Sequence, residues 1–155
     1  MFLDRYEVEI NQNSTIYEFI SKGKKGEIKK MIRYSATNLK DFFNLGFGDL
    51  DEKTGKIDDT VVTDNGDSEK VLATVAASVY AFTANNLEAW VFIEGRGLGR
   101  KRLYRIAITK YLDIIEEDFV VFGLLDNAWQ PFLKNQDYEA FAIKRHINDD
   151  DKKNK

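Results

Sequence analysis

The sequence predicts an α+β fold: an antiparallel meander of about five strands, then helix, strand, helix and about three further strands. In the first 65 residues, short β-branched and aromatic runs alternate with turns rich in glycine or asparagine, which is typical of a meander. The spacing of apolar residues then changes from two to three and four, which indicates a helix. We expect both helices to pack on the sheet.

The chain has 155 residues, enough for one domain with a sizeable core. Hydrophobic residues make up 43% of it, including 11 Phe and 7 Tyr, which argues against general disorder. We therefore expect residues 1–147 to form a single α+β domain. Residues 148–155 carry no apolar side chain and are expected to form a disordered, charged tail.

The expected meander places apolar side chains at alternate positions, so that each strand has one apolar face. Its turns contain the residues that tolerate tight backbone geometry, namely glycine, asparagine and aspartate. The expected strands span residues 6–10, 16–21, 27–34, 41–48 and 57–63.

A short glycine-lysine segment, residues 23–26, suits a tight hairpin between the second and third strands. The strand after it directs Ile32 and Tyr34 toward the core. Its other face carries Lys29 and Arg33 and is therefore expected to be basic.

The first helix is predicted from Asp67 or Ser68, either of which can cap it, to Asn85 and Asn86. Negative charge at Glu69 is favourable in the first turn of a helix. Apolar residues recur at spacings of three and four and form a stripe that would face the sheet: Val71, Leu72, Val75, Ala76, Val79 and Phe82.

The second half continues with a short buried strand at residues 89–94 and a helix at about 99–115. The inward side of that helix is expected to carry Leu103, Ala107, Ile108, Tyr111 and Ile115. Strands are expected at 119–124, 128–132 and 138–145, the first two joined across a turn at Asp126 and Asn127.

Composition excludes several classes of functional site. The chain has no Cys and one His, so it cannot supply a cysteine-ligated metal, a disulfide framework or a multi-histidine metal site. No nucleotide fingerprint, nucleophile elbow or carboxylate pair with acid–base geometry is present, so we assign no catalytic residue, metal or cofactor. Without an apolar signal or membrane segment, the expected location is cytoplasmic, with no membrane partner.

A glycine- and arginine-rich segment leads into the second helix. Cations at a helix N-terminus are unfavourable unless an anion binds there, because the free amides already carry partial positive charge. The sequence therefore indicates an anion or phosphate site, although pairing with acids of the chain itself is an equally plain explanation. The residues of the predicted site are Arg96, Gly97, Gly99, Arg100, Arg102 and Arg105.

A secondary basic patch is expected at Lys24, Lys25, Lys29 and Arg33. If it faced the same way as the arginine segment, the two would form a footprint for RNA or single-stranded DNA on a chain of net charge −3. Lysines at a sheet edge also protect against aggregation, which is the simpler explanation. Aromatic residues of the strands are expected in the core, namely Tyr17, Phe19, Tyr34 and Phe42, while Trp90 and Trp129 are expected as core or interface residues.

Four stretches together resemble a family of small single-domain proteins of unknown function, chiefly from Bacteroidetes. These stretches are the Phe47-Gly48-Asp49 strand with its following turn, residues 61–75, residues 102–111 and residues 138–145. The resemblance covers nearly the whole chain and implies a bacterial, intracellular, free-standing domain. It implies no catalytic residue, and it supports Arg102 and Tyr104 as positions of the family pattern.

Three functions follow as hypotheses. The leading one is a non-enzymatic binding protein whose basic site holds a phosphate-bearing ligand such as RNA or single-stranded DNA. The second is a protein-interaction component of a toxin–antitoxin or defence pair, with an acidic partner. The third is an enzyme that acts on a small phosphorylated substrate. The sequence leaves the oligomeric state open.

Overall fold

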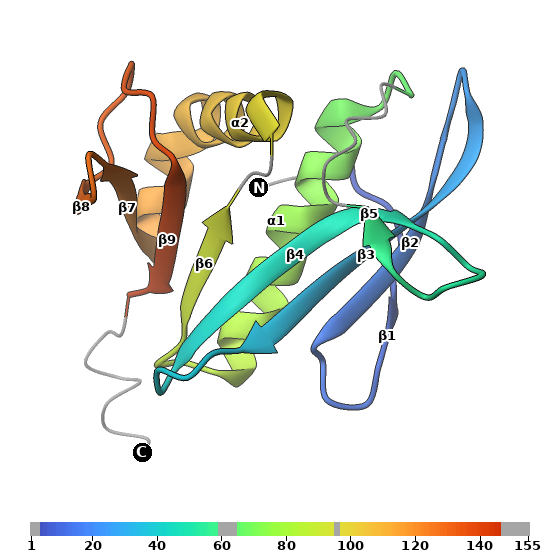
Figure 1. The fold of residues 1–155 in the computed structure, drawn as a ribbon, viewed down its shortest axis with the longest axis horizontal. Coiled ribbons are helices and arrows are strands. Elements are labelled where there is room, and N and C mark those ends of the chain that lie inside the picture. The colour runs from blue at the N-terminus through green and yellow to red at the C-terminus, as the bar shows by residue number, and fades with distance from the viewer. Residues whose placement is uncertain (1–3, 59–64, 95–96, 147–155) are drawn as a thin grey trace.

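The computed structural model describes residues 4–58, 65–94 and 97–146, and it confirms the α+β class (Figure 1). Two helices, α1 (Ser68–Asn85) and α2 (Gly97–Asp118), lie on one mixed sheet. The strands are β1 (Glu9–Ile10), β2 (Ile16–Gly23), β3 (Gly26–Ala36), β4 (Phe42–Leu50), β5 (Ile57–Asp58), β6 (Trp90–Glu94), β7 (Phe119–Leu125), β8 (Ala128–Pro131) and β9 (Ala140–Arg145).

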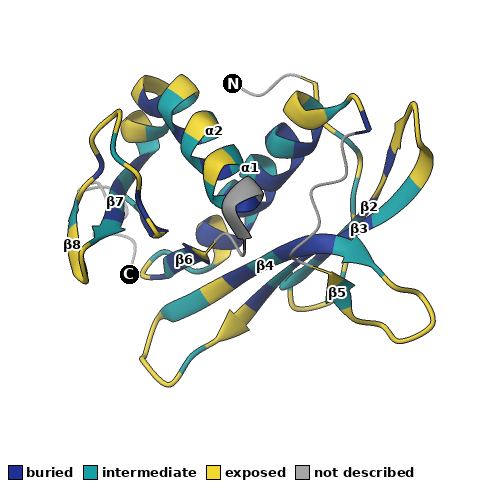
Figure 2. Cartoon of the chain, turned by 45° about the horizontal axis from the view of Figure 1, so that its top comes forward, coloured by how far each residue is buried: buried dark blue, intermediate teal, exposed yellow. Residues whose placement is uncertain are grey.

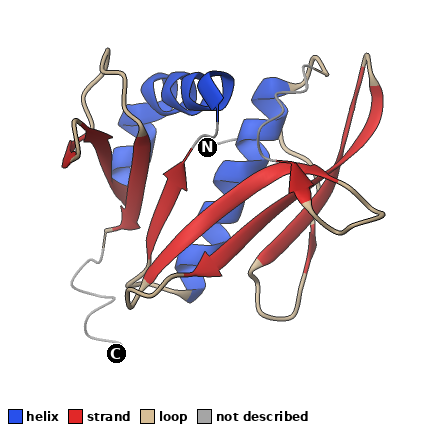
Figure 3. Cartoon of the chain, in the orientation of Figure 1, coloured by secondary structure: helices blue, strands red, loops and turns tan. Residues whose placement is uncertain are grey.

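The strand order along the sheet is β1-β2-β3-β4-β6-β9-β7-β8, and β5 pairs with the far end of β4. Every pair is antiparallel except β4 and β6, which run parallel. Parallel neighbours need a crossover connection, and α1 supplies it (Figure 3). The ladder between β4 and β6 covers only Phe42–Leu45 of β4, and β4 next pairs with β5 at Asp49 and Leu50.

Helix α1 begins and ends where its local signals predict. Val71, Val75, Val79 and Phe82 are buried against the sheet, and the Phe82 ring stacks on Tyr34 with centroids 4.2 Å apart. The Tyr34 hydroxyl lies 2.7 Å from the Ser78 hydroxyl, and burial raises the pKa of Tyr34 well above its usual value. This phenol therefore stays protonated and ties the middle of α1 to β3.

Asp67 occupies the N-cap position of α1 but its side chain makes no capping hydrogen bond. Its carboxylate instead accepts hydrogen bonds from the hydroxyls of Tyr6 (2.6 Å) and Ser21 (2.5 Å). The predicted capping role of this side chain is thus replaced by a tether between the N-terminal segment, β2 and the start of α1.

Helix α2 packs beside α1 on the same face of the sheet, and the residues buried between sheet and helices form one core (Figure 2). Its buried residues, among those whose burial is described, are Arg100, Tyr104, Ile108 and Leu112, spaced by four. Of the five residues expected inward only Ile108 is fully buried, because the stripe that meets the sheet lies one position later. The others are half-buried and, except for Leu103, line an apolar cavity of about 90 Å3 between the two helices.

The strand boundaries differ from expectation mainly near the chain ends. Strand β1 covers only Glu9–Ile10 of the expected 6–10, and the backbone N–H of Tyr6 donates to the Thr74 hydroxyl of α1. The predicted turn at Asp126 and Asn127 is confirmed, with φ of 51° and 63° as a tight hairpin requires. Most of the strand expected at 57–63, and the tail expected at 148–155, lie outside the described residues.

Candidate functional site: an open face of the sheet

The predicted arginine site is divided among different surroundings. Arg100 is only 2% exposed, and its guanidinium carbon lies 4.6 Å from the centroid of the Phe47 ring. Arg102 is exposed, whereas Arg105 pairs with Asp137 at 3.0 Å. Helical spacings of two and five residues direct Arg102 and Arg105 away from Arg100, whereas their own spacing of three places these two side chains on the same side of α2.

The remaining members of that predicted site lie at the helix start. Gly97 and Gly99 fall in the first turn of α2, and Arg96 lies outside the described residues. Among the described arginines, Arg100 thus lies apart from Arg102 and Arg105. Anion binding at the start of α2 stays a prediction.

The secondary basic patch is also divided. Lys24 and Lys25 protrude at the β2–β3 hairpin, which forms at the predicted residues. Lys29 lies 3.7 Å from both Glu18 and Glu52, so acids of the chain surround its charge. Arg33 lies further along β3, on the face of the sheet opposite the helices.

That opposite face, which we call the open face, carries a row of aromatic rings. Phe42 and Trp90 stack with centroids 6.0 Å apart, and Trp90 meets the edge of Phe122 at 5.7 Å. Phe92 meets Trp129 at 5.6 Å, and Trp129 is 43% exposed. We call these five residues the aromatic patch; they come from β4, β6, β7 and β8.

Strand register explains why these rings gather. Phe92 is paired with Ala142 of β9, which is paired in turn with Phe122 of β7. Ala142 and Ala140 are 4% and 2% exposed although they sit on the same face, and larger side chains of the neighbouring strands flank both of them. Small residues on β9 therefore let side chains from both sides meet above it.

Sequence patterning did not identify the aromatic patch as an exposed surface. Trp90 and Phe92 alternate with Val91 and Ile93, so both faces of β6 are apolar and the pattern reads as a fully buried strand. Only the placement of both helices on one face shows which half is open. Of the four ring residues expected in the core, Tyr17, Phe19 and Tyr34 are buried, whereas Phe42 is half-buried on the open face.

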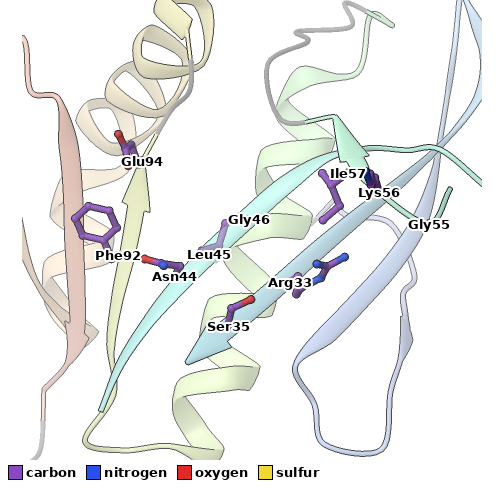
Figure 4. A pocket seen from close by; sticks show the side chains of 10 residues that line it. All are labelled: Arg33, Ser35, Asn44, Leu45, Gly46, Gly55, Lys56, Ile57, Phe92 and Glu94. Carbon is purple, nitrogen blue, oxygen red and sulfur yellow. The ribbon is translucent and has the colours of Figure 1, made fainter. Parts of the chain in front are cut away.

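Next to the aromatic patch the open face is hollowed to about 510 Å3 (Figure 4). The hollow lies where the pairing of β4 with β6 has ended and its pairing with β5 begins. Gly46 lies at its floor, and a Cβ placed there would find only the Arg33 carbonyl oxygen, at 3.8 Å, so the floor is bare backbone. The functional side chains that line the hollow are Arg33, Ser35, Asn44, Lys56, Phe92 and Glu94.

Three cations accompany the rings and the hollow. Arg33 and Lys56 line the side of the hollow away from the patch, as Figure 4 shows. The Lys144 ammonium lies 5.9 Å from the centroid of the Trp90 ring and 3.4 Å from Glu88. Glu94 is the acidic residue of the lining. The open face thus combines flat apolar rings with separated positive charges.

Within residues 4–58, 65–94 and 97–146, no cluster of three or more His, Cys, Asp or Glu side chains is placed to hold a metal ion. Neither helix of the described chain has the length and apolar character needed to cross a lipid bilayer.

Comparison with known proteins gives one finding. Residues 3–146 match the model of a family of unknown function, DUF6934. The chain belongs to this family. The resemblance seen in the sequence is thereby confirmed at the level of a family of unknown function, while its bacterial range stays a prediction. No curated protein and no solved structure matches the chain.

Proposed function

We propose that this DUF6934 protein binds single-stranded RNA or DNA on the open face of its sheet. The observation that carries the proposal is the aromatic patch, because partly exposed rings on a face without helices are an unusual use of large apolar side chains. Unpaired bases are ligands that flat rings can stack on, and such stacking contributes about 1–3 kcal/mol per base.

The charges of the open face favour a nucleic acid over a purely apolar partner. Lys144 lies beside the Trp90 ring, and Arg33 and Lys56 lie at the far side of the hollow. A single strand presents bases and phosphates alternately, so it can place bases on the rings while phosphates reach the separated cations. A duplex hides its base faces, and we therefore expect it to bind more weakly than a single strand.

Tryptophan fluorescence tests the proposal directly, because both tryptophans of the chain belong to the aromatic patch. Titration with RNA and DNA 12-mers of mixed sequence should quench the emission. Trp129→Ala should weaken binding, measured by the anisotropy of labelled strands, about tenfold. The matched control is Ile106→Ala on α2, which removes a side chain that is 49% exposed on the other face and should leave affinity unchanged.

Two results would overturn the proposal. One is the absence of quenching and of any anisotropy change with every single strand tested. The other is concentration-dependent self-association that Trp129→Ala abolishes while strand binding stays absent, because this would assign the aromatic patch to a protein interface.

A further inference from the structure

We propose that the hollow holds one guanine nucleotide of the bound strand. This inference rests on the proposed function and deepens it. Phe92 belongs to the aromatic patch and also lines the hollow, so a strand that crosses the patch reaches the hollow without leaving the surface. The volume of about 510 Å3 lies in the range of small-ligand sites and exceeds what a nucleotide needs.

At Gly46, no side chain covers the backbone at the floor of the hollow. The ladder between β4 and β6 stops at Leu45 and Ile93, and the ladder with β5 starts at Asp49. Within the described residues, Gly46 lies between the two ladders, whereas the Asp58 carbonyl lies against Gly48. Because Gly46 carries no side chain, a ligand can approach the main chain closely there.

The two phosphates that flank the guanosine are assigned to Arg33 and Lys56, one to each. The hydrogen bond found for the Arg33 side chain within the described residues goes to the Met31 sulfur at 3.6 Å, a weak acceptor. A guanidinium offers five donors in a planar fork that matches phosphate oxygens, so most of this capacity is available to a ligand. Lys56 is exposed on the loop before β5 and adds a second positive charge to the same side of the hollow.

The Glu94 carboxylate makes the hollow selective for guanine over the other bases. A carboxylate beside a phosphate site weakens the binding of any ligand that is merely an anion. Guanine is the base whose Watson–Crick edge presents two adjacent donors, N1–H and the 2-amino group, which the two oxygens of a carboxylate can accept together. The other bases place an acceptor beside each donor. Asn44, on the strand next to Phe92, supplies an amide donor for the guanine O6.

Glu94→Gln separates this assignment from simple charge repulsion because the two predict opposite signs. The probes are a uridine 12-mer and the same strand with one central guanosine. We expect the wild-type chain to bind the guanosine strand about tenfold more tightly. Glu94→Gln should weaken binding of the guanosine strand and strengthen binding of the uridine strand, since it removes a negative charge but also an acceptor.

The matched control is Glu117→Gln on α2, which makes the same charge change at an exposed site and should leave the preference intact. Equal strengthening of both strands by Glu94→Gln, or equal binding of both strands by the wild-type chain, would overturn the assignment. If Trp129→Ala still weakens both strands in that case, the proposed function stands and only the guanine site fails. If no strand binds, both fail.

Discussion

Lys30 shows how this protein accommodates a charge in its core. The residue is spaced by two from Ile28 and Ile32, so its side chain shares their inward face, and it is 3% exposed. Its ammonium donates to Asp49, the residue paired with it on β4, at 2.5 Å. Attraction at this distance offsets the desolvation of both ions, so the pair is tolerated as long as it stays complete.

Removing the two partners of this pair should have unequal effects. Asp49→Ala leaves a buried ammonium without its carboxylate and should lower the free energy of unfolding by about 3 kcal/mol. Lys30→Met should cost clearly less, because an apolar chain of similar length fills the same space and the Asp49 side chain, 23% exposed, can be hydrated. Urea denaturation measures both values. A Lys30→Met variant as unstable as Asp49→Ala would contradict this account.

At the scale of elements, Asn65 attaches the β2–β3 hairpin to the start of α1. Its side-chain oxygen accepts the backbone N–H of Lys25 at 2.6 Å, and its amide nitrogen donates to the Gly26 carbonyl at 3.0 Å. The same nitrogen donates to the Ser21 hydroxyl at 3.1 Å, and Asn65 is 1% exposed. One buried side chain therefore holds a hairpin that carries two exposed lysines.

Asn65→Ala should lower the free energy of unfolding by about 2–3 kcal/mol, because it leaves buried groups of the hairpin without partners. Amide hydrogen exchange should accelerate first at Lys25, whose N–H loses its acceptor. Asn85→Ala, at the exposed end of α1, is the matched control and should change stability little. A hairpin with unchanged exchange at Lys25 would show that the strand ladder alone holds it.

Local sequence signals predict the elements of this chain well. The features that they do not predict depend on contacts between residues far apart in the sequence. Helix α1 and the turn at Asp126 and Asn127 depend on residues close in sequence, and both form as predicted. The sequence predicts Asp67 as a helix cap, but its carboxylate accepts hydrogen bonds from Tyr6 and Ser21, which lie in distant segments of the chain.

In the candidate site, local patterns placed single residues but did not show which strands become neighbours. Arg33 was expected on a basic outer face of β3 and lies in the hollow, which agrees with simple strand alternation. Trp129 and Phe92 meet across β9, which lies between β6 and β7, and strand order cannot be read from periodicity. Glu94 and Lys56 line the same hollow because β6 and β5 both pair with β4, so no local motif marks them.

At the scale of the whole molecule, charge and shape separate the two faces of the sheet. The chain has a net charge of −3, so it has no general attraction for nucleic acid. Both helices cover one face (Figure 2). The other face is therefore left to present rings and three cations. Any electrostatic attraction must therefore act over short range, at the positions of those cations.

This arrangement predicts the salt dependence of binding. Three phosphate contacts, one each at Arg33, Lys56 and Lys144, should give a plot of log K against log salt concentration a slope of about −2 for a single strand. Lys144→Gln removes one contact and should make the slope shallower by about 0.7, whereas Trp129→Ala should lower affinity at every salt concentration and leave the slope unchanged. Anisotropy titrations between about 50 and 500 mM KCl measure both quantities.

A slope near zero in the wild-type chain would show that these cations do not touch phosphate. An equal change of slope in both variants would show that stacking and charge are not carried by separate residues.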